Sequence, residues 1–187
     1  MTFPLEIPPR DDKTWIQTYT GKQAWPLNPH PDDIDIEDIA HALSLQCRYT
    51  GHTLFHYSVA QHSFLMSFEF AEPMLAMWAL LHDASEAYLC DIARPIKSSL
   101  ANYQGYEDML MRVIADKFDL PWPMPEEIKE KDLAMLVAER NQLLKAPPIP
   151  WHSTVGVPDI GIKITETPWY MVKKFFLQRY NQLKGTW

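Results

Sequence analysis

The sequence predicts an all-helical domain with a small β-hairpin near its N-terminus. Between residues 36 and 183, apolar residues recur at helical spacing in several stretches that prolines and capping residues separate. Before residue 30 the pattern differs, because two short stretches, 15–19 and 24–27, flank the turn-like Thr20-Gly21-Lys22. Two short extended stretches around such a turn are typical of a hairpin.

Length and composition indicate one globular domain over residues 1–187, with a hairpin and loop extension at 1–30 and a loop and C-terminal helix at 146–187. A chain of 187 residues is long enough for one core and short for two domains. Its apolar fraction of 47% and charged fraction of 22% match an ordinary soluble protein. No apolar run approaches the ~20 residues that span a bilayer, and no secretory signal is visible. We therefore expect a cytoplasmic protein without a membrane partner.

Charge argues against a nucleic-acid partner, and cysteine content argues against disulfides and a cysteine zinc site. The formal net charge of −7 argues against a nucleic-acid polymer as partner, because such binding needs a basic face. A small phosphorylated substrate remains compatible, since a bound cation and a few local basic residues can reverse the potential inside a cleft. Cys47 and Cys90 show no paired spacing, so neither a disulfide framework nor a cysteine zinc site is expected.

Two helices are predicted in the first half of the chain. The first runs from Ile36 to Cys47, with Asp35 as its N-cap. After a loop that begins at Arg48, the stretch Ser58-Val59-Ala60-Gln61 has the pattern of a capping box, in which Ser58 is the N-cap and Gln61 the third helical residue. This pattern places His62 in the first turn of the second helix.

The third predicted helix runs from about Pro73 to Tyr88 and is apolar nearly all round, as expected of a central helix. Inside this apolar run lie His82, Asp83 and Glu86. Burying three such groups is costly unless they bind something. The proline-broken stretch Cys90–Lys97 is predicted to be a loop over this site.

The second half of the chain predicts three more helices. They cover Tyr106–Phe118, a segment from near Pro125 through Leu144, and a segment from Thr167 to Leu183. Residues 147–158 contain several prolines and are left as a loop. The aromatic C-terminal helix could supply an interface, so a homo-oligomer is expected.

Two imidazoles and two carboxylates from three predicted helices form a plausible ligand set for one divalent transition metal, either Co, Mn, Zn, Fe or Ni. Such a metal acidifies water and polarises a phosphoryl oxygen, and additional Mg could accompany the substrate phosphates. The predicted metal ligands are His62, His82, Asp83 and Asp132.

Nearby side chains suggest the remaining roles. Glu86, one turn after His82, could take or deliver a proton, and Asp91 is a second candidate for that role. Arg48 and Lys97 are predicted to bind phosphate oxygens, Arg48 with its planar fork and Lys97 as a point charge.

Four stretches, Tyr57–Ser63, Leu81–Glu86, Cys90–Lys97 and Lys131–Asp132, form one combined pattern. This pattern resembles the HD-domain phosphohydrolases, and most of all the bacterial 5′-deoxynucleotidases and the phage dATP and dNTP triphosphohydrolases. The similarity covers roughly Ile36–Leu144. The resemblance implies an HD-domain helical bundle that hydrolyses deoxynucleotides in nucleotide-pool control. A dNMP would yield nucleoside and phosphate, and a dNTP would yield nucleoside and tripolyphosphate. For a phage-encoded chain the compartment would be the host cytoplasm.

The resemblance also assigns residues. It implies the four metal ligands already named, the acids Glu86 and Asp91, and the phosphate contacts Arg48 and Lys97. Tyr49 stands where the nucleotidases have a tryptophan after their arginine, and it is therefore expected against the sugar or the base.

One further departure from the family pattern is Cys90, which stands before Asp91 where the family usually has glycine. We therefore expect the turn geometry to differ at this position.

Simpler roles remain open for several of these residues. Glu130 or Asp116 could replace Asp132 as ligand, Glu86 could only orient a ligand, and Arg48 could offset its helix dipole. Lys97 could be a solvated loop charge. For the whole protein, the alternatives are an HD-type phosphodiesterase for cyclic or linear dinucleotides and a non-catalytic module that a metal stabilises.

Overall fold

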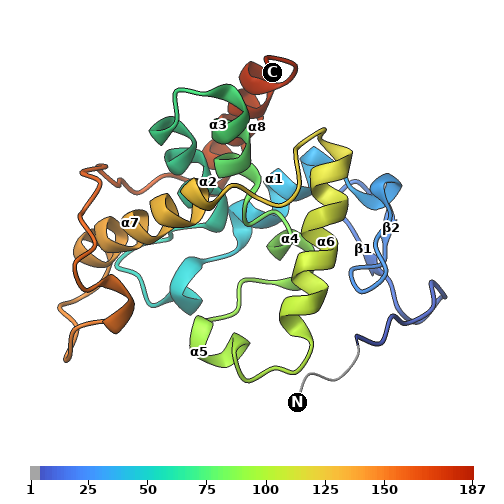
Figure 1. Cartoon of the computed structure of the whole chain (residues 1–187), viewed down its shortest axis with the longest axis horizontal. Coiled ribbons are helices and arrows are strands. Elements are labelled where there is room, and N and C mark those ends of the chain that lie inside the picture. The colour runs from blue at the N-terminus through green and yellow to red at the C-terminus, as the bar shows by residue number, and fades with distance from the viewer. Residues whose placement is uncertain (1–4) are drawn as a thin grey trace.

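In the computed structural model, which describes residues 5–187, the chain is mostly helical with a small antiparallel hairpin near the N-terminus (Figure 1). The predicted all-helical fold with a hairpin is confirmed. Strand β1 (Ile16–Gln17) pairs with β2 (Gln23–Ala24), with Ile16 opposite Ala24. Within the described part of the chain, no helix is both long and apolar enough to cross a membrane.

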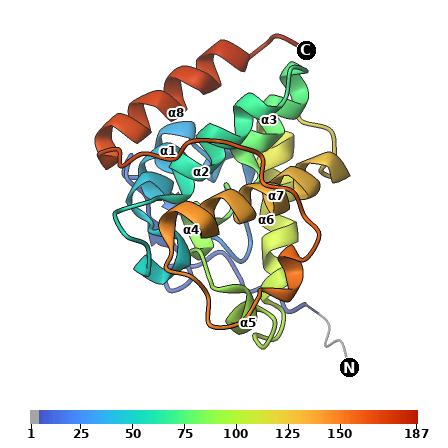
Figure 2. The same cartoon turned by 90° about the vertical axis from the view of Figure 1, so that its left-hand side faces the viewer.

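The helices pack around an apolar core in which α8 contacts α1, α2 and α3, and α2 contacts α1 and α3. Figure 2 shows α8 lying along the edge of the bundle that α1, α2 and α3 form. Trp78, Ile39, Leu43 and Phe176 are fully buried in this core. The helices are α1 (Ile36–Leu45), α2 (Val59–Met66), α3 (Pro73–Leu81), α4 (Glu86–Leu89), α5 (Arg94–Lys97), α6 (Tyr103–Lys117), α7 (Glu126–Leu143) and α8 (Trp169–Leu183).

The predicted helix starts are largely confirmed. The Asp35 side chain accepts a hydrogen bond from the backbone N–H of Glu37, and Ser58 caps α2 by accepting from the N–H of Gln61. Only half of the predicted capping box forms, because the Gln61 side chain donates instead to the carbonyl of Thr165 at 2.8 Å. This bond ties the start of α2 to the segment before α8.

The prediction that the first helix reaches Cys47 is wrong. Helix α1 ends at Leu45, and Cys47 pairs with Ser58 in an isolated antiparallel bridge. Next to this bridge, the N–H of Arg48 donates to the carbonyl of Tyr57 at 2.9 Å. Arg48 therefore lies outside α1, close to the start of α2, and does not offset the dipole of α1 from its last turn.

The predicted continuous helix from Pro73 to Tyr88 is broken in the structure. Helix α3 ends at Leu81 and α4 begins at Glu86. In between, the N–H of Ala84 donates to Leu81 and that of Glu86 to Asp83, so the backbone bonds span three residues rather than four. This tighter turn places His82 and Asp83 at the C-terminal end of α3.

Two further boundaries differ from the prediction. The stretch expected to be a loop over the site contains α5, in which Pro95 occupies a first-turn position that tolerates its missing N–H. Helix α6 begins at Tyr103 instead of Tyr106, after Asn102 in the left-handed conformation.

Candidate metal centre

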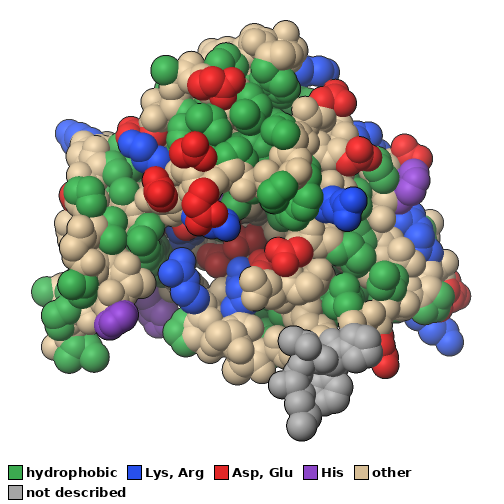
Figure 3. All heavy atoms as spheres, viewed as in Figure 1, with side chains coloured by type: hydrophobic (Ala, Val, Ile, Leu, Met, Phe, Trp, Pro, Cys, Tyr) green, Lys and Arg blue, Asp and Glu red, His purple; other side chains and the backbone are tan. Residues whose placement is uncertain are grey.

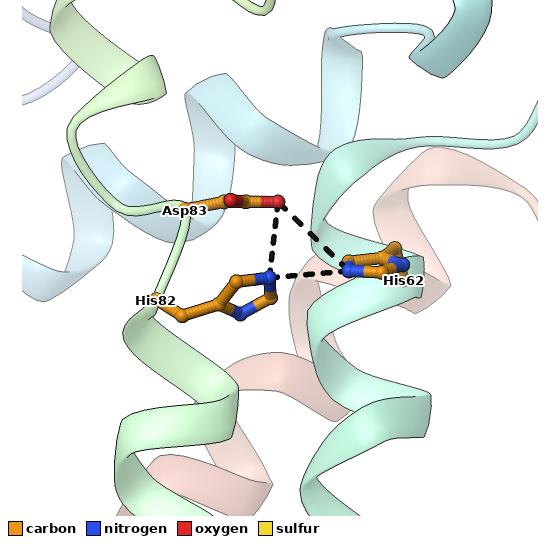
Figure 4. A group of neighbouring side chains, drawn as sticks. All are labelled: His62, His82 and Asp83. Carbon is orange, nitrogen blue, oxygen red and sulfur yellow. Dashed lines mark hydrogen bonds and ion pairs between the residues drawn. The ribbon is translucent and has the colours of Figure 1, made fainter. Parts of the chain in front are cut away.

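Three predicted ligands, His62, His82 and Asp83, come together where α2 meets the end of α3 (Figure 4). The fourth, Asp132, approaches them from α7. The Nε2 atoms of His62 and His82 lie 3.2 Å apart, and Asp83 Oδ2 is 3.2 Å from His82 Nε2. One ligand atom from each of these three residues lies within 4.8 Å of the others, so this group could hold a metal ion. Asp132 Oδ1 adds a carboxylate 3.2 Å from His62 Nε2.

The hydrogen-bond partners of both imidazoles assign their tautomers. His62 Nδ1 lies 2.6 Å from Glu139 Oε1, and His82 Nδ1 lies 2.8 Å from the carbonyl oxygen of Ala79. A carbonyl oxygen and an ionised carboxylate can only accept, so each Nδ1 carries the hydrogen. In the neutral rings both Nε2 atoms are then lone-pair donors that face each other beside two carboxylates. Four such atoms need a cation between them, either a metal or an added proton.

Glu139 orients this centre, and the sequence reasoning missed it. It lies on α7 with its side chain fully buried, and it accepts hydrogen bonds from Tyr49 and Tyr57 as well as from His62. A carboxylate on the far ring nitrogen fixes the tautomer and the orientation of a metal-binding histidine. The available signal was its position seven residues after Asp132, which places both acids on one face of α7.

Arg48 lies between two of the acids. Its side chain is 13% exposed, with Nη1 3.2 Å from Asp83 Oδ2 and Nη2 3.3 Å from Glu139 Oε2. Burial disfavours the charged form, but these carboxylates raise the pKa of Arg48 well above its ordinary value. Tyr49 and Thr50 follow in the left-handed conformation, with φ of 56° and 54°, which is unusual for residues with a Cβ. This turn holds the Tyr49 hydroxyl against Glu139.

The cluster carries perturbed pKa values. Burial and Arg48 lower the pKa of His62, but Glu139 and Asp132 outweigh them and raise it to about 9. Burial disfavours the charged form of both Glu139 and Asp132. Arg48 and His62 nevertheless lower the pKa of Glu139 to about 2, and the bond to His62 lowers that of Asp132 to about 2. Without a metal, an imidazolium therefore supplies the cation that the acceptors require.

The two predicted catalytic acids lie beside the cluster. Glu86 is 6% exposed, and burial together with the negative charges of Asp83 and Asp91 raises its pKa well above the ordinary value. Among residues 5–187, its buried Oε2 has no hydrogen-bond partner. Gln46 links the two acids, because its amide donates to the Glu86 carbonyl at 2.9 Å and accepts from the Asp91 N–H at 3.0 Å.

Lys97 and Cys90, which both follow α4, have an ion-pair partner and an unusual backbone conformation respectively. Lys97 is paired rather than solvated, with Nζ 2.7 Å from Glu107 Oε1 and 3.8 Å from Glu86 Oε1. Cys90 has φ of 70° and ψ of 152°, a conformation that is essentially reserved for glycine. A residue with a side chain therefore occupies a backbone conformation that favours glycine.

A cavity of about 680 Å³ opens over the cluster, which is within the usual range for small-molecule sites. Figure 3 shows acidic side chains deep in a hollow with basic side chains at its rim. His62 and His82 do not line the cavity, whereas the other predicted site residues do. The lining consists of Arg48, Tyr49, Asp83, Glu86, Asp91, Ile92, Ala93, Arg94, Pro95, Lys97, Ser98, Asp132, Leu136, Trp151 and Ser153.

The fold and the site define a helical protein with a candidate metal centre at the floor of a mixed-charge cavity. The chain is 37% identical over 172 residues to the uncharacterized protein YfdR of Escherichia coli strain K12, across 91% of this chain and 96% of YfdR. It therefore belongs to the same family as YfdR. It is also 38% identical over 126 residues to an uncharacterized protein of Rhodobacter capsulatus, across 63% of this chain and 64% of that protein. No family model matches the chain.

Proposed function

We propose that the protein is an HD-type metal-dependent phosphohydrolase that acts on deoxynucleotides, as a dNMP 5′-nucleotidase or a dNTP triphosphohydrolase. One observation carries the proposal. Two imidazoles whose Nε2 atoms face each other and two carboxylates converge under a cavity that also contains basic side chains. The imidazoles and carboxylates suit a metal, and the basic side chains suit the phosphates of a small substrate.

The donor set fits one divalent transition metal. His62, His82, Asp83 and Asp132 would hold it, and nitrogen with carboxylate oxygen accommodates Mn, Fe, Co, Ni or Zn. A divalent metal in such a site supplies Lewis acidity, which acidifies water and polarises a phosphoryl oxygen. Glu139 and the Ala79 carbonyl would keep both imidazoles in the tautomer that binds metal.

The other side chains would bind the substrate and move a proton. The raised pKa of Glu86 favours its protonated form, which would suit it to deliver a proton to the leaving oxygen. Asp91, whose pKa burial also raises, is the second acid within the cavity. Arg48 and Lys97 would bind phosphate oxygens, and Lys97 would exchange its bond to Glu107 for one to phosphate.

The test is a product assay with the purified protein supplied separately with Mn²⁺, Co²⁺, Ni²⁺, Zn²⁺ and Fe²⁺. We expect either inorganic phosphate from deoxynucleoside monophosphates or tripolyphosphate from deoxynucleoside triphosphates. Absence of turnover of both panels with every metal would overturn the proposal. Cyclic and linear dinucleotides in the same assay test the phosphodiesterase alternative, which cleavage of those substrates alone would establish.

The variant Glu86→Ala separates catalysis from a purely structural metal. We expect unchanged metal content and unfolding temperature with turnover reduced by about 100-fold or more, the usual contribution of general acid catalysis. Glu127→Ala, an exposed acid in the first turn of α7, is the matched control and should retain full turnover. Loss of metal and of folding in Glu86→Ala would instead support a metal that only stabilises the helices.

A further inference from the structure

One wall of the cavity comes from the segment between α7 and α8, to which the sequence assigned no role. This segment has little regular structure apart from a 3₁₀ turn at His152–Thr154. Figure 2 shows it leaving the end of α7 and passing α5 before it turns back towards α8. Trp151 and Ser153 from this segment line the same cavity as Arg48 and the acids.

Trp151 is held in place by bonds to α7, the helix that carries Asp132. The Thr154 hydroxyl accepts a hydrogen bond from Arg140 Nη1 at 2.6 Å and donates to the carbonyl of Trp151 at 3.0 Å. The same carbonyl accepts the backbone N–H of Thr154 at 3.0 Å. Thr154 is only 6% exposed, so this anchor is protected from water. The backbone that carries the Trp151 ring is therefore anchored to α7 through Thr154 and Arg140.

The lining of the cavity is chemically divided. Trp151 lies beside Tyr49, with ring centroids 6.2 Å apart and planes tilted by 37°, so the two rings form an aromatic corner. Arg94 and Lys97 contribute positive charge from α5, a different segment of the chain. A ligand with a planar end and an anionic end matches this division, because aromatic rings stack on planar groups and cations bind phosphate.

We propose that Trp151 binds the base of the deoxynucleotide by stacking on it. This inference rests on the proposed function and names the side chain that would contact the base of its substrate. Tyr49 is committed by its hydroxyl to Glu139, whereas Trp151 is anchored through its backbone carbonyl and its ring is not tied by such a bond. Within residues 5–187, no protein group accepts the indole N–H of Trp151, while the indoles of Trp15 and Trp25 each donate to a backbone carbonyl.

The test is calorimetric titration of the Mn²⁺-loaded protein with the two parts of the substrate separately. The nucleoside part is probed with deoxyadenosine, deoxyguanosine, deoxycytidine and thymidine, and the anionic part with inorganic phosphate. Loss of one base stack corresponds to about 5- to 150-fold in affinity. We expect Trp151→Ala to weaken nucleoside binding by that factor and to leave phosphate binding within twofold, while Trp151→Phe recovers most of the loss.

Trp169→Ala is the matched control, because Trp169 is 40% exposed on α8 and does not line the cavity. Unchanged nucleoside affinity in Trp151→Ala, an equal loss of nucleoside and phosphate binding, or no nucleoside binding by the wild type would each overturn the assignment. Turnover assays in parallel keep the two proposals separate. Nucleoside binding that depends on Trp151 without turnover refutes only the hydrolase, and turnover with nucleoside affinity indifferent to Trp151 refutes only the stacking role.

Discussion

Replacing Glu139 by Gln tests the reasoning about the metal centre most directly. The change keeps the size of the side chain and removes a fully buried negative charge. That charge faces the Nδ1–H of His62 at 2.6 Å and the guanidinium of Arg48 at 3.3 Å. It touches none of the proposed ligand atoms, so any effect on metal affinity must pass through the orientation and charge of His62.

The structure sets two magnitudes. The pKa of Glu139 falls from an ordinary 4.5 to about 2, which corresponds to about 3 kcal/mol in favour of the ionised carboxyl. Loss of one partner of a buried ion pair costs about 3–5 kcal/mol, which is of the same order. We expect the metal-free Glu139→Gln protein to lose about 3 kcal/mol of unfolding free energy. Changes at such supporting residues lower metal affinity by about 10- to 100-fold.

Both quantities are accessible with standard assays. Urea unfolding followed by circular dichroism in EDTA measures the stability of the metal-free protein. Competition with a chromogenic chelator measures the affinity for Zn²⁺ or Mn²⁺. Glu130→Gln is the control, since Glu130 is an exposed acid on the same helix and the alternative ligand to Asp132. We expect it to leave metal affinity within twofold.

Two outcomes would refute this reasoning. If Glu139→Gln binds metal as tightly as the wild type, Glu139 does not orient His62 for a metal. If Glu130→Gln loses affinity and Asp132→Asn does not, the ligand on α7 is wrong. A loss confined to Glu139→Gln and Asp132→Asn would support the geometry described above.

Three further predictions concern stability. The raised pKa of His62 contributes about 3 kcal/mol that is complete below about pH 6.5 and is lost as the pH rises through about 9. The lowered pKa values of Asp132 and Glu139 contribute stability above about pH 4.5 that is lost towards pH 2. The free energy of unfolding, measured in EDTA, should therefore be highest between about pH 4.5 and 6.5. Cys90→Gly should raise the unfolding free energy by about 1 kcal/mol, because relief of backbone strain exceeds the entropic cost of glycine. A Cys90→Ala protein as stable as Cys90→Gly would contradict this. Ser58→Ala should cost about 1 kcal/mol by uncapping α2 in thermal unfolding, and a change below 0.3 kcal/mol would show that the cap contributes little.

Local patterns predicted the helices well and their ends less well. Capping residues and apolar periodicity depend on neighbours in the chain, so Asp35, Ser58 and Pro73 marked helix starts correctly. The break between α3 and α4 had no such signal, because the residues around His82 continue an apolar helical pattern. The bridge that ends α1 depends on pairing between Cys47 and Ser58, which apolar periodicity does not report.

The sequence by itself determined the chemical types at the candidate centre. The ordered pattern of two histidines and two acids, together with its resemblance to the HD-domain phosphohydrolases, predicted His62, His82, Asp83 and Asp132 as one group, although they come from three separate predicted helices. The spacing of seven residues between Asp132 and Glu139 would have pointed to Glu139 had the buried face of α7 been known. No sequence pattern indicates which acid of α7 faces another helix.

Tertiary packing decided the protonation of the imidazoles, the pairing of Arg48 and the aromatic wall. These features arise from contacts between segments far apart in the chain, such as Glu139 with His62 and Trp151 with Tyr49. Burial then changes the chemistry, because a carboxyl or an imidazole removed from water takes its pKa from the charges that packing places beside it. The residue types therefore follow from the sequence, while their charges and partners follow only from the fold.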